Sequence, residues 1–445
     1  MPSRWIQCIG AGDFRKRLDC CHDSKNVRLP PGAEGGRLAS AVPQDDQAGL
    51  YMKLSQRAMQ VSESATMAVA AKAAQLRRAG KDVLGFGAGE PDFQTPQHIK
   101  DAAKRALDAG HTGYAKPGSG IPEARAAVCE KFRRDNGLTY TPEQTIITVG
   151  GKEALFLACA ALLDPGDEVI LPVPYWVTFP EQVKLCGGEV VLIRGDEAHG
   201  LRLTPDQIVA AITPRTRILI FNSPSNPGGF AYSPEEVRAI AEALSGRDVL
   251  VFSDEMYDRL RYGDKREHLS FAASSPEWHE KTITFNAASK THAMTGWRVG
   301  YAAGPAGIMK AMGRIQSHTT SGTAHFVQHA LVEALTGDQS HVEAMRAEYE
   351  RRGNRMCERL NALRGVSCVR PGGAFYCFPR VRDAFDRLGV TDSQAFCEVV
   401  LDKALVALVP GGAFGCDDNV RLSFANSMDH IDAGLDRLEK LLGKA

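Results

Sequence analysis

Residues 286–300 read NAASKTHAMTGWRVG and hold one lysine and one arginine among small residues. Lys290 follows an apolar run, where desolvation would lower the pKa of its ammonium and free the lone pair for attack on a carbonyl carbon. Arg298 comes eight residues later and offers a forked cation that suits a phosphate monoester. A solvated surface lysine is the ordinary alternative for any single lysine. The position after an apolar run favours a Schiff-base lysine with an anion-binding arginine nearby.

Three other stretches carry polar groups of the kind that a cofactor site needs. TVGGKEAL places Gly150 and Gly151 between a strand and a helix, where free N–H groups and the helix dipole suit a phosphate; a tight turn without function is the alternative. FSDEMYD puts Asp254 after an apolar strand and Tyr257 three residues later. That carboxylate could orient a cationic ring or cap a helix. NSPSNPGG contains two successive Asn-x-Pro turns, the second at Asn226.

Taken together, these groups suggest pyridoxal 5'-phosphate. Its aldehyde needs an amine, its pyridinium nitrogen needs a carboxylate, and its phosphate needs a cradle. The stretch GFGAGE at 85–90 offers the spacing GxGxG, but Pro91 and a loop follow it and no βαβ unit precedes it, which argues against a dinucleotide. We assign no metal site.

The elements that must position these groups alternate between strand and helix. Short apolar strands are expected at 145–151, 167–174, 188–194, 216–224, 248–255 and 281–290. Because each strand is apolar throughout, the pattern predicts an α/β fold with a mostly parallel sheet covered on both faces. Ligands of such sheets bind at the carboxyl ends of the strands. The glycine pair, Asp254 and Lys290 all follow predicted strands, so we expect them to meet at one edge.

The composition limits the classes of protein to which this chain can belong. Lysine plus arginine and aspartate plus glutamate each number 53, so the formal net charge is zero and no nucleic acid or anionic membrane is expected as a partner. No apolar run approaches the roughly 20 residues that span a bilayer. Eleven cysteines occur without a CxxC pair, which favours free thiols in a reducing cytoplasm.

The length of 445 residues is enough for two or three domains. Residues 1–51 show no helical or strand period, and we expect a disordered or wrongly assigned extension before a natural start at Met52. Residues 52–97 are expected to form an N-terminal helix, running from 53 to about Gly80, and an arm that joins the small domain. Residues 98–340 are expected to form a large domain, and 341–445 a small α+β domain.

From about Met52 onward the chain resembles the class-I, fold-type-I aminotransferases. It is most similar to the bacterial-type aspartate aminotransferase subgroup, which also includes prephenate aminotransferases. The motifs that carry the resemblance are GEPDFQTP, YAKPGSGIPEAR, VGGKEAL, LDPGDEVILPVPYWVTFP, NSPSNP, SDEMYD, SKTHAMTGWRVGY and VRLSF. The resemblance implies a seven-stranded, mostly parallel sheet and a smaller α+β domain. It also implies a cytoplasmic, pyridoxal-phosphate-dependent homodimer.

The implied activity is amino-group transfer between an L-amino acid, aspartate or glutamate, and a 2-oxo acid by a ping-pong mechanism. Aromatic, prephenate or broad-range transfer is the alternative, as is a lyase or decarboxylase on the same fold. A transcription regulator with this domain would need a DNA-binding module, of which residues 1–51 show no pattern.

The resemblance also implies a role for each matching residue in binding the cofactor. Lys290 forms the Schiff base, Asp254 pairs with the pyridine nitrogen, and these two with Tyr257 form the catalytic set. Tyr257 and Asn226 hydrogen-bond the phenolic oxygen of the ring, and Arg298 takes the phosphate. The full set of expected cofactor-binding residues is Lys290, Gly150, Gly151, Trp176, Asn226, Asp254, Tyr257, Arg298 and Tyr114.

Tyr114 is expected to reach the phosphate of the neighbouring subunit's cofactor, which makes a homodimer necessary. Arg421 is expected to receive the α-carboxylate of the substrate, and Lys152 its distal carboxylate. The full set of expected substrate-binding residues is Gly89, Lys152, Trp176, Asn226, Arg421 and Thr66.

Two positions depart from the family's pattern. The usual Asn-Pro-Thr-Gly is Asn-Pro-Gly-Gly here, with Gly228 in place of the threonine. A serine that many members carry three residues before the lysine is Ala287. We therefore expect one hydroxyl to be absent from the turn and one donor to be absent from the phosphate cradle.

Overall fold

A computed structural model describes residues 54–62, 65–264 and 266–445 of the chain. Residues 54–445 belong to one compact unit. The extension expected at 1–51 lies outside the described residues and stays a prediction.

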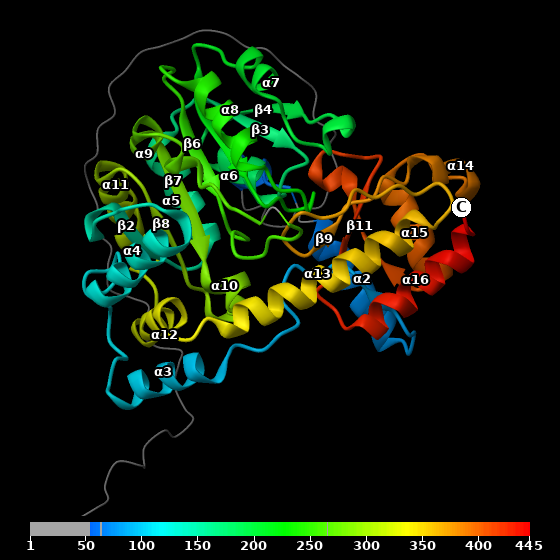
Figure 1. The fold of residues 1–445 in the computed structure, drawn as a ribbon, viewed down its shortest axis with the longest axis horizontal. Coiled ribbons are helices and arrows are strands. Elements are labelled where there is room, and N and C mark those ends of the chain that lie inside the picture. Colours follow the sequence, from blue (N-terminus) through cyan, green and yellow to red (C-terminus); the bar gives the residue numbers. More distant parts are fainter. Residues whose placement is uncertain (1–53, 63–64, 265) are drawn as a thin grey trace, which may run out of the picture. The chain divides into compact units, whose positions relative to one another are not determined.

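The centre of the described chain is a seven-stranded sheet, as the resemblance implied (Figure 1). Its strand order is β2-β8-β7-β6-β5-β3-β4, and every neighbouring pair is parallel except the two that involve β8. The strands are β2 (Thr145–Thr148), β3 (Glu168–Val173), β4 (Glu189–Arg194), β5 (Thr216–Asn222), β6 (Leu250–Asp254), β7 (Thr282–Ala287) and β8 (Gly300–Ala303). Six of them match the predicted strands. The sequence analysis did not locate β8, which inserts antiparallel between β2 and β7.

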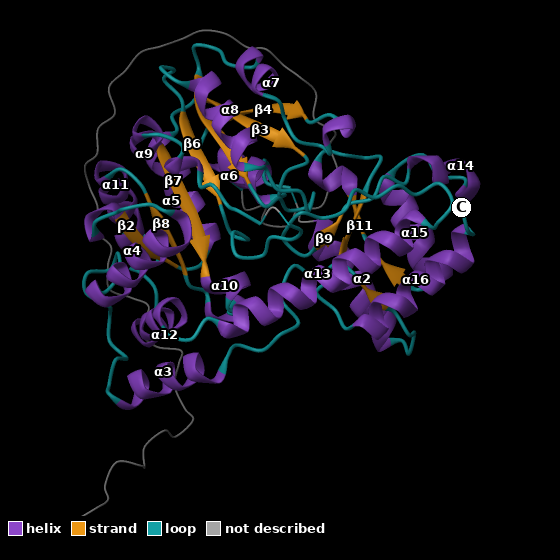
Figure 2. Cartoon of the chain, viewed as in Figure 1, coloured by secondary structure: helices purple, strands orange, loops and turns teal. Residues whose placement is uncertain are grey.

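Both faces of this sheet are covered along β2, β3 and β5–β8, whose residues are nearly all buried, whereas the residues of the edge strand β4 are exposed or half-buried. Successive side chains of each strand point to opposite faces. In β5, Ile218 and Ile220 pack with helices α5 (Gly151–Leu162), α6 (Thr178–Leu185) and α11 (Ala306–Ser317). Leu219 and Phe221 pack on the other face with α8 (Pro234–Leu244) and α9 (Pro276–Lys281). Near β2 and β8, that second face is covered by α3 (Gln97–Asp108), α4 (Pro122–Asn136) and α12 (His325–Thr336). Figure 2 shows the orange strands between purple helices. The apolar character of the strands is thus explained by burial on two sides.

At least one helix lies between each two strands of the sheet that are successive in the chain. The helices around the sheet are α3 (Gln97–Asp108), α4 (Pro122–Asn136), α5 (Gly151–Leu162), α6 (Thr178–Leu185), α7 (Pro205–Ala210), α8 (Pro234–Leu244), α9 (Pro276–Lys281), α10 (Ala288–Thr291), α11 (Ala306–Ser317) and α12 (His325–Thr336). Sequence signals explain several boundaries. For example, α8 begins with a capping box in which Ser233 and Glu236 satisfy each other's backbone N–H groups.

A second group of elements forms its own hydrophobic core. It contains α13 (Ser340–Asn361), α14 (Phe385–Leu388), α15 (Ser393–Ala404) and α16 (Met428–Leu442), with strands β9 (Tyr376–Cys377), β10 (Val406–Ala407), β11 (Val409–Pro410) and β12 (Val420–Ser423). The long helix α13 runs from the side of the large sheet toward α15 and α16 (Figure 1). The short strand β1 (Leu84–Gly85) pairs in parallel with β10, so the chain after the first helices contacts this group. The predicted domain boundaries at 97/98 and 340/341 stay predictions.

The N-terminal helix predicted from 53 to 80 is wrong as a single element. The described part contains α1 (Gln56–Met59) and α2 (Ala65–Arg78), because the cap of α1 at Gln60 ends the first helix. The predicted stop is confirmed. Gly80 has a φ of +79°, and the N–H groups of Gly80 and Lys81 bond the carbonyls of Arg77 and Leu76. This pairing is a Schellman motif, which favours glycine at the left-handed position.

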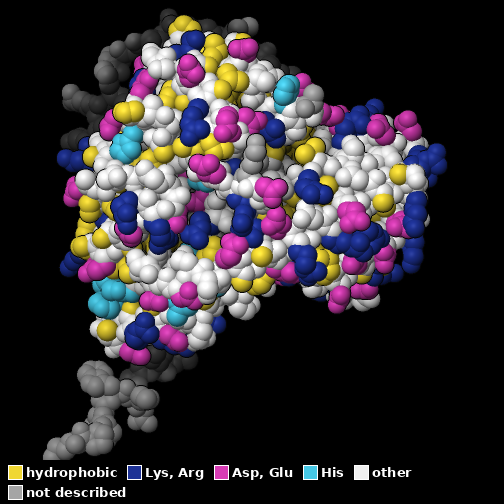
Figure 3. Space-filling view, viewed as in Figure 1, with side chains coloured by type: hydrophobic (Ala, Val, Ile, Leu, Met, Phe, Trp, Pro, Cys, Tyr) yellow, Lys and Arg dark blue, Asp and Glu magenta, His cyan; other side chains and the backbone are white. Residues whose placement is uncertain are grey.

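Three global features bear on function. No helix of the described residues is long and apolar enough to cross a membrane. The eight cysteines of the described segments are all free thiols, as predicted. Side chains of both charge signs are interspersed on the face in Figure 3, in keeping with the formal net charge of zero.

Candidate active site

Lys290 lies in the four-residue helix α10, directly after β7. Its ammonium donates a hydrogen bond to the carbonyl oxygen of Gly89 and lies 5.8 Å from the centre of the Phe375 ring. Desolvation lowers the pKa of Lys290 to about 8, and the nearby cations Arg421 and Arg298 act in the same direction. The amine is therefore much closer to its nucleophilic form at neutral pH than a solvated lysine.

Asp254 is the last residue of β6 and is 4% exposed. One carboxylate oxygen accepts a hydrogen bond from the Met256 N–H at 3.2 Å. Burial raises the pKa of Asp254 to about 7, against the opposing effect of that bond and of Lys290. No lysine, arginine or histidine of the described residues forms an ion pair with it. A buried carboxylate of this kind suits a cationic ring nitrogen, which would supply the missing charge.

The two asparagines of the NSPSNP turn link Asp254 to Arg421. Asn222 ends β5, and its side chain donates to the Asp254 carbonyl at 3.2 Å and accepts from the Asn226 N–H at 2.9 Å. The side-chain oxygen of Asn226 in turn accepts a hydrogen bond from Arg421 at 2.9 Å. The turn that the sequence singled out therefore has a structural role in addition to any contact with a ligand.

Arg421, on β12, is a buried cation without an acidic partner. It is 3% exposed, donates to the Gly87 carbonyl at 3.0 Å, and lies 4.6 Å and 5.0 Å from the ring centres of Tyr376 and Phe414. Its Nε has no hydrogen-bond partner, and no carboxylate of the described residues pairs with the guanidinium. Desolvation lowers its pKa. Such an arrangement fits an anionic ligand that brings the missing charge.

Tyr257 and Tyr376 place two hydroxyl groups between these residues. Both side chains are buried, and their oxygens lie 3.1 Å apart. A Cβ atom added at Gly89 would lie 3.4 Å from the Tyr376 hydroxyl, so the GEPD segment passes closely over this pair. Burial raises the pKa of Tyr257, which keeps it a neutral donor.

Gly150 and Gly151 lie next to Arg298 and outline a cradle at the start of α5, whose role in binding a phosphate stays a prediction. Gly150 precedes α5 with a φ of +78°, and an added Cβ would lie 2.6 Å from the Arg298 guanidinium. At Gly151 an added Cβ would lie 2.4 Å from the end of Met256. The Gly150 N–H donates to the Thr148 carbonyl at 2.8 Å, and the Glu153 N–H donates to the Gly150 carbonyl at 3.2 Å. The N–H groups of Gly151 and Lys152 have no acceptor within α5, so they and the adjacent guanidinium can bind an anion together.

Lys152 and Trp176 lie at the exposed side of this cradle. The Lys152 ammonium is 5.0 Å from the centre of the Trp176 ring. Desolvation and the nearby Arg298 lower its pKa. No carboxylate of the described residues pairs with Lys152. Its position beside both the cradle and Trp176 is compatible with either a cofactor or a substrate contact.

A cleft of about 810 Å³ opens beside these groups. Its lining comes from the segment after Gly89, the segment that carries Arg298, and the beginning of α12: Glu90–Thr95, Val149, Ala293, Thr295–Arg298, Thr323, Ala324, Phe326 and Val327. The phosphate cradle thus borders a space large enough for small molecules.

Of the two departures from the family's pattern, the structure gives a physical account of one. At Gly228 an added Cβ would lie 2.3 Å from the Phe230 ring, so this ring occupies the space that a larger side chain would need. Ala287 is buried, 1% exposed, at the end of β7. It provides no hydroxyl, as the sequence analysis expected.

Tyr376 and Phe375 are site residues that the sequence analysis missed. Their only signal was the glycine pair in PGGAFY, which does not say which strand they will join. A buried network beneath Asp254 was also missed. In it Lys131 pairs with Asp258, and Asn136 links Lys131 to Glu255 at 2.7 Å and 2.8 Å.

Two predicted residues are not brought into this cluster. Tyr114 is 82% exposed and makes no hydrogen bond with the site residues of the described chain. Thr66 lies in α2, and its side chain is outside the part that the structure describes. Their predicted roles stay predictions.

Known proteins resemble this chain over most of its length. Residues 81–438 match the family described as aminotransferase class I and II. An aspartate aminotransferase of Geobacillus stearothermophilus is 47% identical over 88% of this chain and 99% of its own length. An aspartate/prephenate aminotransferase of Cereibacter sphaeroides is 45% identical over 87% of this chain and 98% of its own.

Solved structures give the same result for the fold. The aspartate aminotransferase of Thermus thermophilus with maleate has a TM-score of 0.83 at 45% identity, covering 88% of this chain and 100% of that chain. The enzyme of Rhizobium meliloti has a TM-score of 0.83 at 40% identity, covering 87% and 98%.

Proposed function

Because the chain belongs to the class I and II aminotransferases, we propose that its site uses pyridoxal 5'-phosphate to move an amino group between aspartate or glutamate and a 2-oxo acid. The observation that carries this proposal is Arg421. A buried guanidinium without an acidic partner, close to a lysine with a lowered pKa, suits the α-carboxylate of an amino acid.

The residues present fit the cofactor. Asp254 would hold the ring nitrogen protonated, Tyr257 and Asn226 would donate to the phenolic oxygen, and the cradle of Gly150 and Arg298 would hold the phosphate. When bound, the cofactor supplies an electron sink for the negative charge that develops at the substrate's Cα.

The chain's own groups carry the proton and orient the substrate. Arg421 fixes the α-carboxylate through its planar fork, which also fixes the direction of the Cα–H bond. Lys290 Nζ, with a pKa of about 8, can accept the Cα proton of the amino acid in the first half-reaction. In the second half-reaction it can return a proton to the corresponding carbon of the oxo acid. Because the amino group would stay on the enzyme between release of the first oxo acid and binding of the second, the two half-reactions are expected to follow a ping-pong sequence.

Lys152 supports a dicarboxylic substrate. Its ammonium has no acidic partner among the described residues, and it lies beside Trp176 near the cradle. The competing role is a second cation for the cofactor's phosphate, since Arg298 lowers its pKa. The two roles differ in whether Lys152 discriminates between substrates.

Lys152→Ala tests the choice. If Lys152 binds the distal carboxylate, kcat/KM for aspartate should fall by about 30-fold, equivalent to about 2 kcal/mol. Phenylalanine, which has no second carboxylate, should change far less. Lys184→Ala on α6, where the lysine pairs with Glu181, is the matched control. Equal losses for aspartate and phenylalanine at saturating cofactor would assign Lys152 to the cofactor. Prephenate as the amino acceptor then tests the alternative suggested by the relatives' names.

We also propose a homodimer with shared sites and a cytoplasmic location. The resemblance, in which Tyr114 reaches the cofactor phosphate of the neighbouring subunit, supports the dimer, and the 82% exposure of Tyr114 leaves its side chain accessible to a second chain. Free thiols support a reducing compartment. Sedimentation of the active holoenzyme should give a dimer, and a fully active monomer would contradict the shared site.

A further inference from the structure

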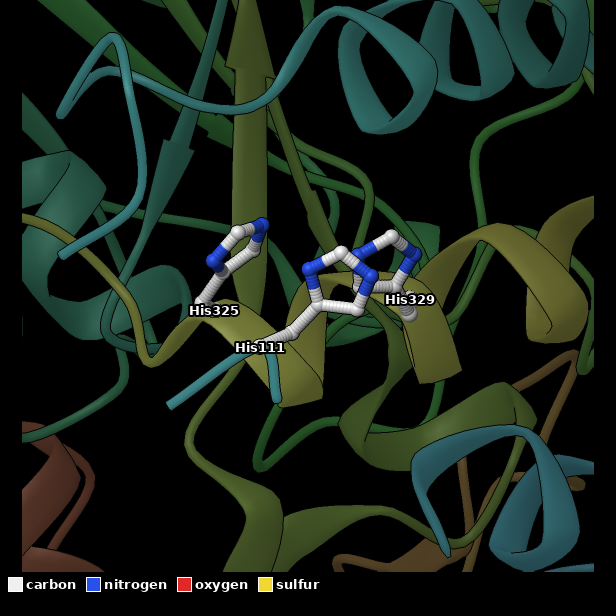
Figure 4. Close-up of side chains that lie close together, drawn as sticks. All are labelled: His111, His325 and His329. Atoms are coloured by element: carbon white, nitrogen blue, oxygen red, sulfur yellow. The ribbon is translucent and has the colours of Figure 1, made fainter. Parts of the chain in front are cut away.

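Three histidine rings from two distant segments meet beside helix α12 (Figure 4). His325 and His329 project from the first turns of α12, and His111 comes from the segment that follows α3. The ring centres of His111 lie 4.6 Å from those of His325 and 4.2 Å from those of His329. The nitrogen atoms that each ring can offer lie within 4.8 Å of one another.

Helix geometry places the first two histidines on one face. Residues four apart on a helix are neighbours on its surface, a spacing that lets two imidazoles bind one metal ion. Phe326 and Val327 line the cleft that borders the cradle, and at about 100° per residue they leave α12 in other directions than the two histidines. The histidine cluster is therefore separate from the site described above.

The backbone that carries the third histidine is fixed. Gly110 has a φ of +83°, and the N–H groups of Gly110 and His111 bond the carbonyls of Leu107 and Ala106. This Schellman motif ends α3 and sets the position of His111. An interaction between His98 and Glu333 at 2.9 Å joins α3 to α12. The distance between the His111 segment and α12 is thus set by contacts outside the histidine cluster.

None of the three rings has a hydrogen-bond partner among the described residues. The Nε2 atom of His329 is buried and unpartnered. Burial and the neighbouring His111 and His325 lower the pKa of His329, which favours the neutral imidazole that a metal needs. Glu123 on α4 acts on His329 in the opposite direction, so a negative charge is also near. Three clustered imidazoles without partners repel one another when protonated and gain from a shared cation.

We propose that His111, His325 and His329 form a binding site for a divalent transition-metal ion, with Zn²⁺ or Ni²⁺ as the chemical class. Imidazole nitrogen suits these ions. Tetrahedral Zn²⁺ with bonds of about 2.0–2.1 Å places its ligands about 3.4 Å apart. Nitrogens within 4.8 Å reach that spacing by small side-chain rotations. Three protein ligands leave one position for water or another small ligand.

Equilibrium dialysis of untagged holoenzyme against Zn²⁺, with metal quantification, tests this site. Wild type should bind one ion per chain at this site. His111→Ala and His329→Ala each remove one metal ligand. Loss of a residue that only hydrogen-bonds a metal ligand typically weakens metal affinity by roughly 10- to 100-fold, so each variant should lose at least that much. His199→Ala is the matched control, since His199 is an exposed histidine that pairs with Asp196 elsewhere. A titration with Ni²⁺ should rank the affinities of the wild type and the variants in the same order.

Two further readouts separate a metal site from a packing role. In metal-free buffer, both cluster variants should keep the wild-type melting temperature and the visible band of the cofactor. Zn²⁺ should raise the melting temperature of wild type and of His199→Ala, but not of the cluster variants. Absence of Zn²⁺ uptake by wild type overturns the proposal. Uptake that neither cluster substitution weakens, for example at one of the free thiols, overturns it as well.

Discussion

Replacing Arg421 with methionine should abolish the preference for substrates that carry an α-carboxylate. The guanidinium is 3% exposed and bonds Asn226 and Gly87 at 2.9 Å and 3.0 Å. Its Nε is unpartnered, and no carboxylate of the described chain neutralises it. A substrate carboxylate would therefore pair with a desolvated, already oriented cation. Loss of that cation strands the carboxylate in the same dry environment.

The size of the effect follows from truncation of a buried charge pair, which costs about 2–5 kcal/mol. At 1.36 kcal/mol for each factor of ten, the rate constant for aspartate should fall by about 30- to 5,000-fold. Arg421→Lys keeps the charge but loses the planar fork, so its loss should be intermediate. Effects on folding oppose each other, because the substitution removes an unpaired buried cation and also leaves two acceptors without a donor.

The assay compares two amines that differ in the group of interest. Aspartate and β-alanine share the amine and the distal carboxylate, but only aspartate has the α-carboxylate. Stopped-flow absorbance of the bound cofactor gives the half-reaction with each. The wild type should react much faster with aspartate, and Arg421→Met should lose most of that difference while its slow reaction with β-alanine changes little. Arg355→Met, which removes a surface ion pair with Asp432, is the control for general damage. Equal losses with both amines, or near wild-type rates with aspartate, would refute the role of Arg421.

Three further outcomes are expected. In cofactor-free protein, folding raises the pKa of Asp254 from 3.8 to about 7, so the folded state binds more protons in that window. The stability of wild type relative to Asp254→Asn should therefore fall as pH rises from about 4 to about 7, by on the order of 4 kcal/mol, and a constant difference in urea unfolding would contradict this. Gly150→Ala should displace the guanidinium that packs against it and weaken cofactor binding about tenfold or more in a visible-absorbance titration. Gly166→Ala, with a φ of +96° but no atom within 4 Å of the added Cβ, should lose stability only. Lys131→Met should lower the free energy of unfolding by about 3–5 kcal/mol because Asp258 is then buried without a partner, and a change too small to measure by chemical denaturation would remove that reasoning.

The amino-acid sequence by itself predicted the class of the fold and singled out several residues that the structure brings together in the candidate site. Apolar strands alternate with helices, and that local pattern is sufficient to predict a parallel sheet buried on both faces. The rule that ligands bind at the carboxyl ends of such strands then selects Gly150, Asp254 and Lys290 from many similar residues. Each of these follows its strand directly, so its position depends on local sequence.

Only the tertiary structure decided which distant groups touch. Arg421 bonds Asn226 across 195 residues, and Tyr376 reaches Tyr257 across 119. The strand β8 is short and rich in small residues, and its place between β2 and β7 depends on the strands that flank it. The meeting of His111 with the histidines of α12 likewise depends on how α3 packs. Sequence periodicity indicates which side of a helix or strand is buried. It does not indicate which other element covers that side, because this depends on packing over the whole core.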